Sequence, residues 1–138
     1  MHETGRAQQL ASLVRPLHGL TVTKATVSPQ GTLRLELHGH RVRIYTIGWR
    51  VDTGERIVAG SADPVDVLSR TVTVLEGQRL NATLIESPSL DTTWEFETAT
   101  VRVFPVYYGG DGDAVYWTAE VPDVGMVVAG PGLSWRVQ

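Results

Sequence analysis

Two histidines separated by a single residue, His38 and His40, are the first side chains in the chain that could bind a metal ion together. Side chains two positions apart on a strand lie on the same face, where two imidazoles can coordinate one zinc ion. No third histidine lies nearby, and the corresponding stretch of the second half, residues 97–99, has none. We therefore interpret His38-Gly39-His40 as a polar hairpin turn and predict neither a metal site nor a cofactor.

A second candidate is the segment Tyr107-Tyr108-Gly109-Gly110-Asp111-Gly112-Asp113. Its Asp-x-Asp pair resembles the start of a calcium-binding loop, but the further oxygen ligands and the final glutamate of an EF-hand are missing. One interpretation is a hairpin tip without a function. The other is a contact loop, because loops on a rigid β scaffold often bind partners and tyrosines are good anchors. In that case Tyr107, Tyr108, Asp111 and Asp113 bind the partner.

The sequence contains none of the familiar catalytic motifs. Its serines do not occur in a Gly-x-Ser-x-Gly turn, and the glycine-rich segment 130–132 lacks the Gly-Lys-Ser/Thr end of a phosphate-binding loop. The chain has no cysteine, which excludes thiol catalysis and cysteine-bound zinc. These observations predict a non-catalytic protein with no catalytic residues.

Composition limits the environment and the partners. The net charge is −3, so the basic excess typical of nucleic-acid-binding proteins is missing. No segment has the length and apolarity of a signal peptide or a membrane span. The lack of cysteine fits a reducing compartment. We therefore predict a cytoplasmic protein that binds neither nucleic acid nor membranes.

The chain repeats itself once. Residues 17–45 and 75–104 share an ordered series of matches, first at an offset of 58 residues and then at 59. Matched apolar positions keep their apolar type, and the matches include two pairs of glycines and one pair of tryptophans. The matches are Leu17/Leu75, Gly19/Gly77, Val22/Leu80, Leu35/Trp94, Val42–Tyr45/Val101–Phe104, Trp49/Trp117 and Ile57–Gly60/Val127–Gly130. We predict a single domain over residues 1–138, with one repeat at about 5–60 and the other at about 63–138.

Each repeat is expected to contain one short helix followed by about five antiparallel strands. Apolar residues alternate with polar ones at Leu33, Leu35 and Leu37, which predicts a strand with one buried face. Helical spacing occurs in residues 5–15 and again after Pro64, with a strand-like segment expected after Arg70. The fold class is therefore mainly β, either a sandwich or a barrel-like domain.

The tryptophans leave two interpretations. Trp49, Trp94, Trp117 and Trp135 could form an aromatic binding face, but three of them occupy positions defined by the repeat. Core packing is therefore the favoured interpretation.

The repeated motifs also carry a resemblance. The patterns LxGxxV, LxLxL/WxF, VRV-aromatic and VVAGPG, over residues 17–133, resemble a family of small actinobacterial two-repeat β-domains of unknown function. Members of that kind are similar to immunity-type or accessory proteins encoded near larger effectors. The resemblance implies a protein-binding role and transfers no catalytic residue.

We accordingly predict a non-catalytic module that binds and covers a protein partner, in the manner of an immunity or accessory protein. The alternative is a small-ligand-binding β-barrel or sandwich, whose ligand would lie in a cavity lined by the tryptophans. An open edge strand would also permit a homodimer.

Overall fold

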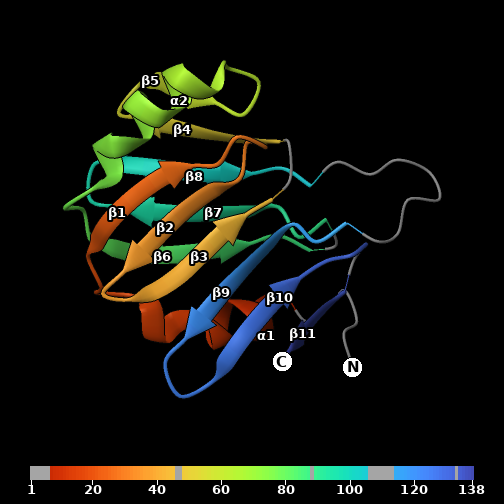
Figure 1. Cartoon of the computed structure of the whole chain (residues 1–138). Coiled ribbons are helices and arrows are strands. Elements are labelled where there is room, and N and C mark those ends of the chain that lie inside the picture. Colours follow the sequence, from red (N-terminus) through yellow and green to blue (C-terminus); the bar gives the residue numbers. More distant parts are fainter. Residues whose placement is uncertain (1–6, 46–47, 88, 106–113, 133) are drawn as a thin grey trace.

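Two antiparallel sheets pack face to face in the computed structural model, which describes residues 7–45, 48–87, 89–105, 114–132 and 134–138. Within these residues, eleven strands form a six-stranded sheet of order β1-β2-β3-β9-β10-β11 and a five-stranded sheet of order β5-β4-β8-β7-β6 (Figure 1). The prediction of a mainly β fold is confirmed, and the arrangement is a sandwich rather than a closed barrel. The strands are β1 (Val22–Val27), β2 (Leu33–Leu37), β3 (His40–Ile44), β4 (Trp49–Thr53), β5 (Arg56–Gly60), β6 (Leu80–Ile85), β7 (Thr92–Phe96), β8 (Ala99–Val103), β9 (Trp117–Val121), β10 (Gly125–Ala129) and β11 (Trp135–Val137).

A short helix precedes the strands of each repeat, as predicted. These helices are α1 (Ala7–Leu13) and α2 (Val65–Thr71), which are offset by 58 residues at both ends. Each is followed by a 3-10 helix, η2 (Arg15–Leu17) or η3 (Val72–Leu75). No helix in the described segments has the length and apolarity needed to cross a bilayer.

The expectation of a strand-like segment after Arg70 is wrong, because this stretch forms η3. Val72 and Leu75 are three residues apart and both are fully buried, which matches the three-residue period of a 3-10 helix. The hydroxyl of Thr73 donates to the carbonyl of Arg70 at 2.6 Å and reinforces the turn. Burial of two side chains on one face therefore outweighs the β propensity of Thr-Val-Thr-Val.

The two repeats exchange strands. The first three strands of one repeat pair with the last strands of the other, so β3 lies beside β9 and β8 lies beside β4. Figure 1 shows this exchange as orange strands next to blue ones in the nearer sheet. The two pairings have the same register, because Ile44 lies opposite Trp117 and Val103 lies opposite Trp49.

A pseudo-two-fold axis passes between the starts of β1 and β6. Thr21 and Arg79, which are offset by 58 residues, form an isolated bridge with each other. On either side, the N–H of Gly19 donates to the carbonyl of Leu80 at 2.7 Å, and the N–H of Gly77 donates to the carbonyl of Val22 at 2.8 Å. The helices follow the same exchange, since α1 contacts β6 and α2 contacts β1.

One sequence match is out of register in the structure. Val51 lies opposite Ala59, and its counterpart Ala119 lies opposite Val127. The structural counterpart of Ala59 is therefore Val127 rather than Ala129, two residues away from the sequence match. The reason is that cross-strand pairing and a bulge between Val51 and Asp52 determine the register of the strands. Similarity of the two sequence segments does not determine it.

The space between the sheets is filled by side chains of both repeats, which form one hydrophobic cluster. Trp49, Trp94 and Trp117 lie inside it and are at most 2% exposed, which confirms that they pack the core. The rings of Trp94 and Trp117 meet edge to face, with centroids 5.0 Å apart and planes at 79°. Trp135, on the edge strand β11, is half-buried.

Candidate functional site

Of the two segments singled out in the sequence, the structure describes only the one with His38 and His40. The proposed contact residues Tyr107, Tyr108, Asp111 and Asp113 lie outside the described residues, so their role stays a prediction. His38 and Gly39 form the turn between β2 and β3 and have φ values of 49° and 85°. Two central residues with positive φ are typical of a type I′ hairpin turn. Across the described ranges, no group of three metal-ligating side chains comes together.

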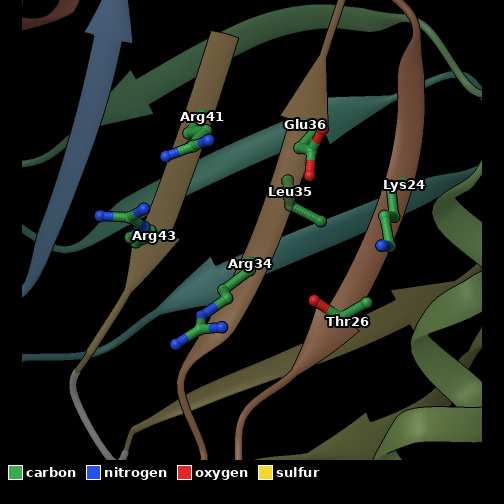
Figure 2. Close-up of a pocket in the computed structure, with 7 residues that line it drawn as sticks. All are labelled: Lys24, Thr26, Arg34, Leu35, Glu36, Arg41 and Arg43. Atoms are coloured by element: carbon green, nitrogen blue, oxygen red, sulfur yellow. The ribbon is translucent and has the colours of Figure 1, made fainter. Parts of the chain in front are cut away.

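The most distinctive surface is the outer side of β1, β2 and β3. It forms an open hollow of about 310 Å³. Four basic side chains and one carboxylate lie on this side of the three strands (Figure 2). The lining residues are Lys24, Thr26, Arg34, Leu35, Glu36, Arg41 and Arg43. We call the surface that carries Lys24, Arg34, Arg41 and Arg43 the basic face.

Strand pairing determines which charges are neighbours on the basic face. Glu36 lies directly opposite Lys24 on one side and Arg41 on the other. Arg34 lies directly opposite Arg43. Among the described residues, no carboxylate forms an ion pair with either of these two arginines. Like charges at directly opposite positions destabilise a sheet. The basic face therefore contains a pair of cations that the fold does not neutralise.

The five-stranded sheet also has two arginines directly opposite each other, in a different setting. There Arg50 lies opposite Arg102, the counterpart of Arg43. Asp52 binds both guanidinium groups, with each Nε 3.1 Å from a carboxylate oxygen. Arg50 also lies over the ring of Phe104, 5.1 Å from its centroid. The second sheet thus holds both of its opposed arginines on one carboxylate of the fold, which offsets part of their charge.

The carboxylate that corresponds to Asp52 does not do the same for the basic face. Its counterpart in β9 is Glu120, at the offset that relates Trp49 to Trp117. Glu120 accepts a hydrogen bond from the backbone N–H of Arg41, at 3.2 Å from its Oε1. Its side chain therefore lies beside the backbone of β3 and forms no ion pair with Arg34 or Arg43.

The two repeats differ most in their solvent-facing residues. Most inward positions stay apolar in both copies, for example Leu35 and Trp94, although buried Ala25 and Leu33 correspond to buried Thr83 and Thr92. On the outer face, three of the four basic residues have no basic counterpart in the second repeat. The pairs are Lys24/Ala82, Arg34/Thr93 and Arg41/Thr100, whereas Arg43/Arg102 and Glu36/Glu95 are kept. The two repeats therefore share the same arrangement of strands, but only the first repeat carries the basic face.

A second hollow adjoins the basic face on the same sheet, over β9, β10 and β11. Its volume is about 430 Å³. Thr118 connects the two areas, since it lies opposite Arg43 on one side and Val128 on the other. The lining residues are Tyr45, Val115, Thr118, Met126, Val128, Arg136 and Gln138. One side of the six-stranded sheet thus combines a cationic area with a more apolar one.

Two titratable side chains with displaced pKa values lie elsewhere. Burial, followed by the charge of Arg15, lowers the pKa of His18, whose Nε2 lies 3.0 Å from the hydroxyl of Thr83 in β6. The backbone N–H of Arg79 donates to Glu97 at 2.9 Å and lowers the pKa of that carboxyl group. Both side chains lie near the five-stranded sheet, away from the basic face.

The basic face could not be recognised from the net charge of the whole chain, because acidic residues elsewhere outweigh its local excess of basic side chains. The signal that identifies it is the two-residue turn at His38-Gly39. Such a turn fixes the register of its hairpin, which places residue 36 opposite 41 and residue 34 opposite 43. A local count of charge on that hairpin then reveals the opposed arginines.

Replacing Arg34 by threonine, the residue of the second repeat at this position, is expected to stabilise the protein. The change removes the repulsion from Arg43 and should raise the free energy of unfolding by about 0.2 to 1 kcal/mol. Urea denaturation at low salt measures the gain, which should shrink at high salt because added ions screen the repulsion. A loss of stability in the variant would show that Arg34 has a stabilising role in the fold.

Comparisons of the chain with protein-family models, with curated proteins and with solved structures found no match.

Proposed function

We propose that the protein is a non-catalytic binding module that covers a partner protein with the outer side of its six-stranded sheet. One observation carries the proposal, namely that this side shares little of the charge pattern of its counterpart, while most of the core has kept its apolar character. The five-stranded sheet pairs its opposed arginines with Asp52, whereas no carboxylate in the described part of the chain forms an ion pair with Arg34 or Arg43. A destabilising arrangement of this kind is expected where the surface serves binding rather than folding.

The shape and composition of this side support a protein partner. A cationic area next to an area with Tyr45 and Met126 provides both polar contacts and apolar contact area. Both hollows are open and lie side by side, which suits a broad partner surface. The resemblance to immunity-type and accessory proteins agrees with a module that covers its partner, and we place both proteins in the cytoplasm.

The test uses one bulky substitution in the middle of this side and one on the opposite sheet. Thr118→Trp adds an indole between the two hollows without changing the charge. Thr93→Trp is the matched control, because Thr93 is also a half-buried threonine on an outer sheet face. The readout is affinity capture of tagged protein from a lysate of its source, with mass spectrometry of the proteins that co-elute.

We expect the wild type and Thr93→Trp to retain one stoichiometric partner through a salt wash, and Thr118→Trp to lose it. Unchanged capture by Thr118→Trp would refute the assignment of this surface. A wild-type lane without any partner would refute the proposal of a constitutive protein partner. Thermal unfolding of each variant verifies that the fold is intact.

A further inference from the structure

We infer that the basic face binds an acidic segment of the partner, in which carboxylates of aspartate or glutamate contact Arg34 and Arg43. The inference rests on the proposed function and adds the chemistry of the partner. Of these two arginines, Arg34 has Thr93 as its counterpart in the second repeat, whereas Arg43 has Arg102.

The first argument is the local balance of charge. Four cationic side chains and one carboxylate line a hollow of about 310 Å³, although the whole chain has a net charge of −3. Glu36 lies between Lys24 and Arg41 and offsets part of their charge. Arg34 and Arg43 are left as neighbouring cations, so an anionic group placed between them would relieve their repulsion.

The second argument is the kind of cation. Arginine presents a planar set of N–H donors that matches a carboxylate in two parallel hydrogen bonds. Arg34 is exposed and Arg43 is half-buried, so both guanidinium groups are accessible from the solvent side. The five-stranded sheet demonstrates the geometry within this chain, since Asp52 there binds two arginines on neighbouring strands at 3.1 Å each. A carboxylate of the partner would bind Arg34 and Arg43 as Asp52 binds Arg50 and Arg102 on the other sheet.

The third argument favours a protein over a nucleic acid. Interfaces with nucleic acid are much more positively charged than interfaces between proteins, and the chain has a pI of about 5.7. The neighbouring hollow with Tyr45 and Met126 offers apolar contacts, which a polypeptide can use.

The test measures binding of three fluorescent probes to the full chain by anisotropy. They are a glutamate-rich peptide, the same peptide with glutamine in place of glutamate, and a single-stranded DNA oligonucleotide. We compare the wild type with Arg34→Thr/Arg43→Thr. The control is Arg56→Thr/Arg70→Thr, which removes the same charge from two exposed arginines outside the six-stranded sheet.

The wild type and the control should bind the glutamate-rich peptide in preference to both other probes. The Arg34→Thr/Arg43→Thr variant should bind that peptide at least about tenfold more weakly, because charge-assisted hydrogen bonds contribute strongly to affinity. An equal loss of peptide affinity in the control would show that the effect comes from the overall charge of the protein, which would overturn the inference. No loss in Arg34→Thr/Arg43→Thr, or tighter binding of the oligonucleotide than of the peptide, would also overturn it.

The same variants separate this inference from the proposed function. If Thr118→Trp abolishes capture of the partner while Arg34→Thr/Arg43→Thr affects neither capture nor peptide binding, the function stands and the acidic segment is refuted. If peptide binding requires Arg34 and Arg43 but capture survives Thr118→Trp, the face binds carboxylates and the assigned role of the surface is refuted.

Discussion

Trp117→Ala is expected to lower the free energy of unfolding by about 3 to 5 kcal/mol, the usual cost of truncating a buried tryptophan. The side chain is 0% exposed and meets Trp94 edge to face at 5.0 Å. Its Nε1 donates to the hydroxyl of Thr92 at 3.0 Å. It also lies opposite Ile44, in the pairing that connects the two repeats. The substitution would leave a cavity, remove a buried hydrogen bond and weaken the contact between the repeats.

Chemical denaturation followed by circular dichroism measures this loss, and two variants calibrate it. Trp117→Phe keeps most of the apolar volume and should cost less. Trp135→Ala affects a half-buried residue on the edge strand β11 and should also cost less. If Trp135→Ala proved the more damaging change, the core would not be centred on the tryptophans between the sheets.

Separating the two repeats is expected to abolish folding, and mixing them is expected to restore it. A fragment of residues 1–62 lacks β9, the partner of β3, and a fragment of residues 63–138 lacks β4, the partner of β8. Each fragment also leaves its helix without the strand that it packs on in the intact chain. A three-stranded sheet with an uncovered apolar face has too little buried area to offset the loss of chain entropy.

Circular dichroism and size-exclusion chromatography of each fragment, alone and after mixing, provide the measurement. The control is the intact chain with a protease site inserted between Ala62 and Asp63, two exposed residues in the joint. After cleavage, this protein should remain assembled at its original size. A monomeric fragment that unfolds cooperatively by itself would show that one repeat can pair its own strands.

Much of the fold could be predicted from the sequence because the signals are local. Apolar residues at Leu33, Leu35 and Leu37 alternate with polar ones, as expected for a strand with one buried face, and the structure forms strand β2 there. The short helices were visible from the spacing of apolar residues such as Leu10 and Leu68, both 0% exposed. The strand-like reading after Arg70 failed because a short β-branched run also fits a 3-10 turn when its apolar residues lie three apart.

The exchange between repeats could not be predicted, and the reason lies in the symmetry of the sequence. Trp49 and Trp117 are equivalent residues, so β3 could accept either β4 or β9 as a neighbour with the same pattern of side chains. Alternation and turn chemistry are identical in the two arrangements. Whether β3 pairs with β4 or with β9 depends on the chain connections and on three-dimensional packing. The alternation of apolar and polar residues does not specify either of these.

The candidate site was missed for a related reason. Arg34 and Arg43 looked like ordinary members of a solvated strand face, and their significance appears only when the register places them opposite each other. The comparison that gives this pair its meaning is with Arg50, Asp52 and Arg102 on the other sheet. The sequence repeat shows that Arg43 corresponds to Arg102. Only the strand pairing in the structure shows which arginine lies opposite each of them.

The strand exchange has a consequence for synthesis on the ribosome. The first repeat emerges with β1, β2 and β3 ready to form a local meander, yet β9 is made much later. Until then, the edge of β3 and the apolar faces of Leu35 and Val42 lack their final cover. Two nascent chains close together can therefore pair β3 of one with β9 of the other, because that interface is the same within and between chains. Rapid completion of the second repeat in the same chain favours the monomer, so translation speed and expression level should influence how much of the product is intertwined.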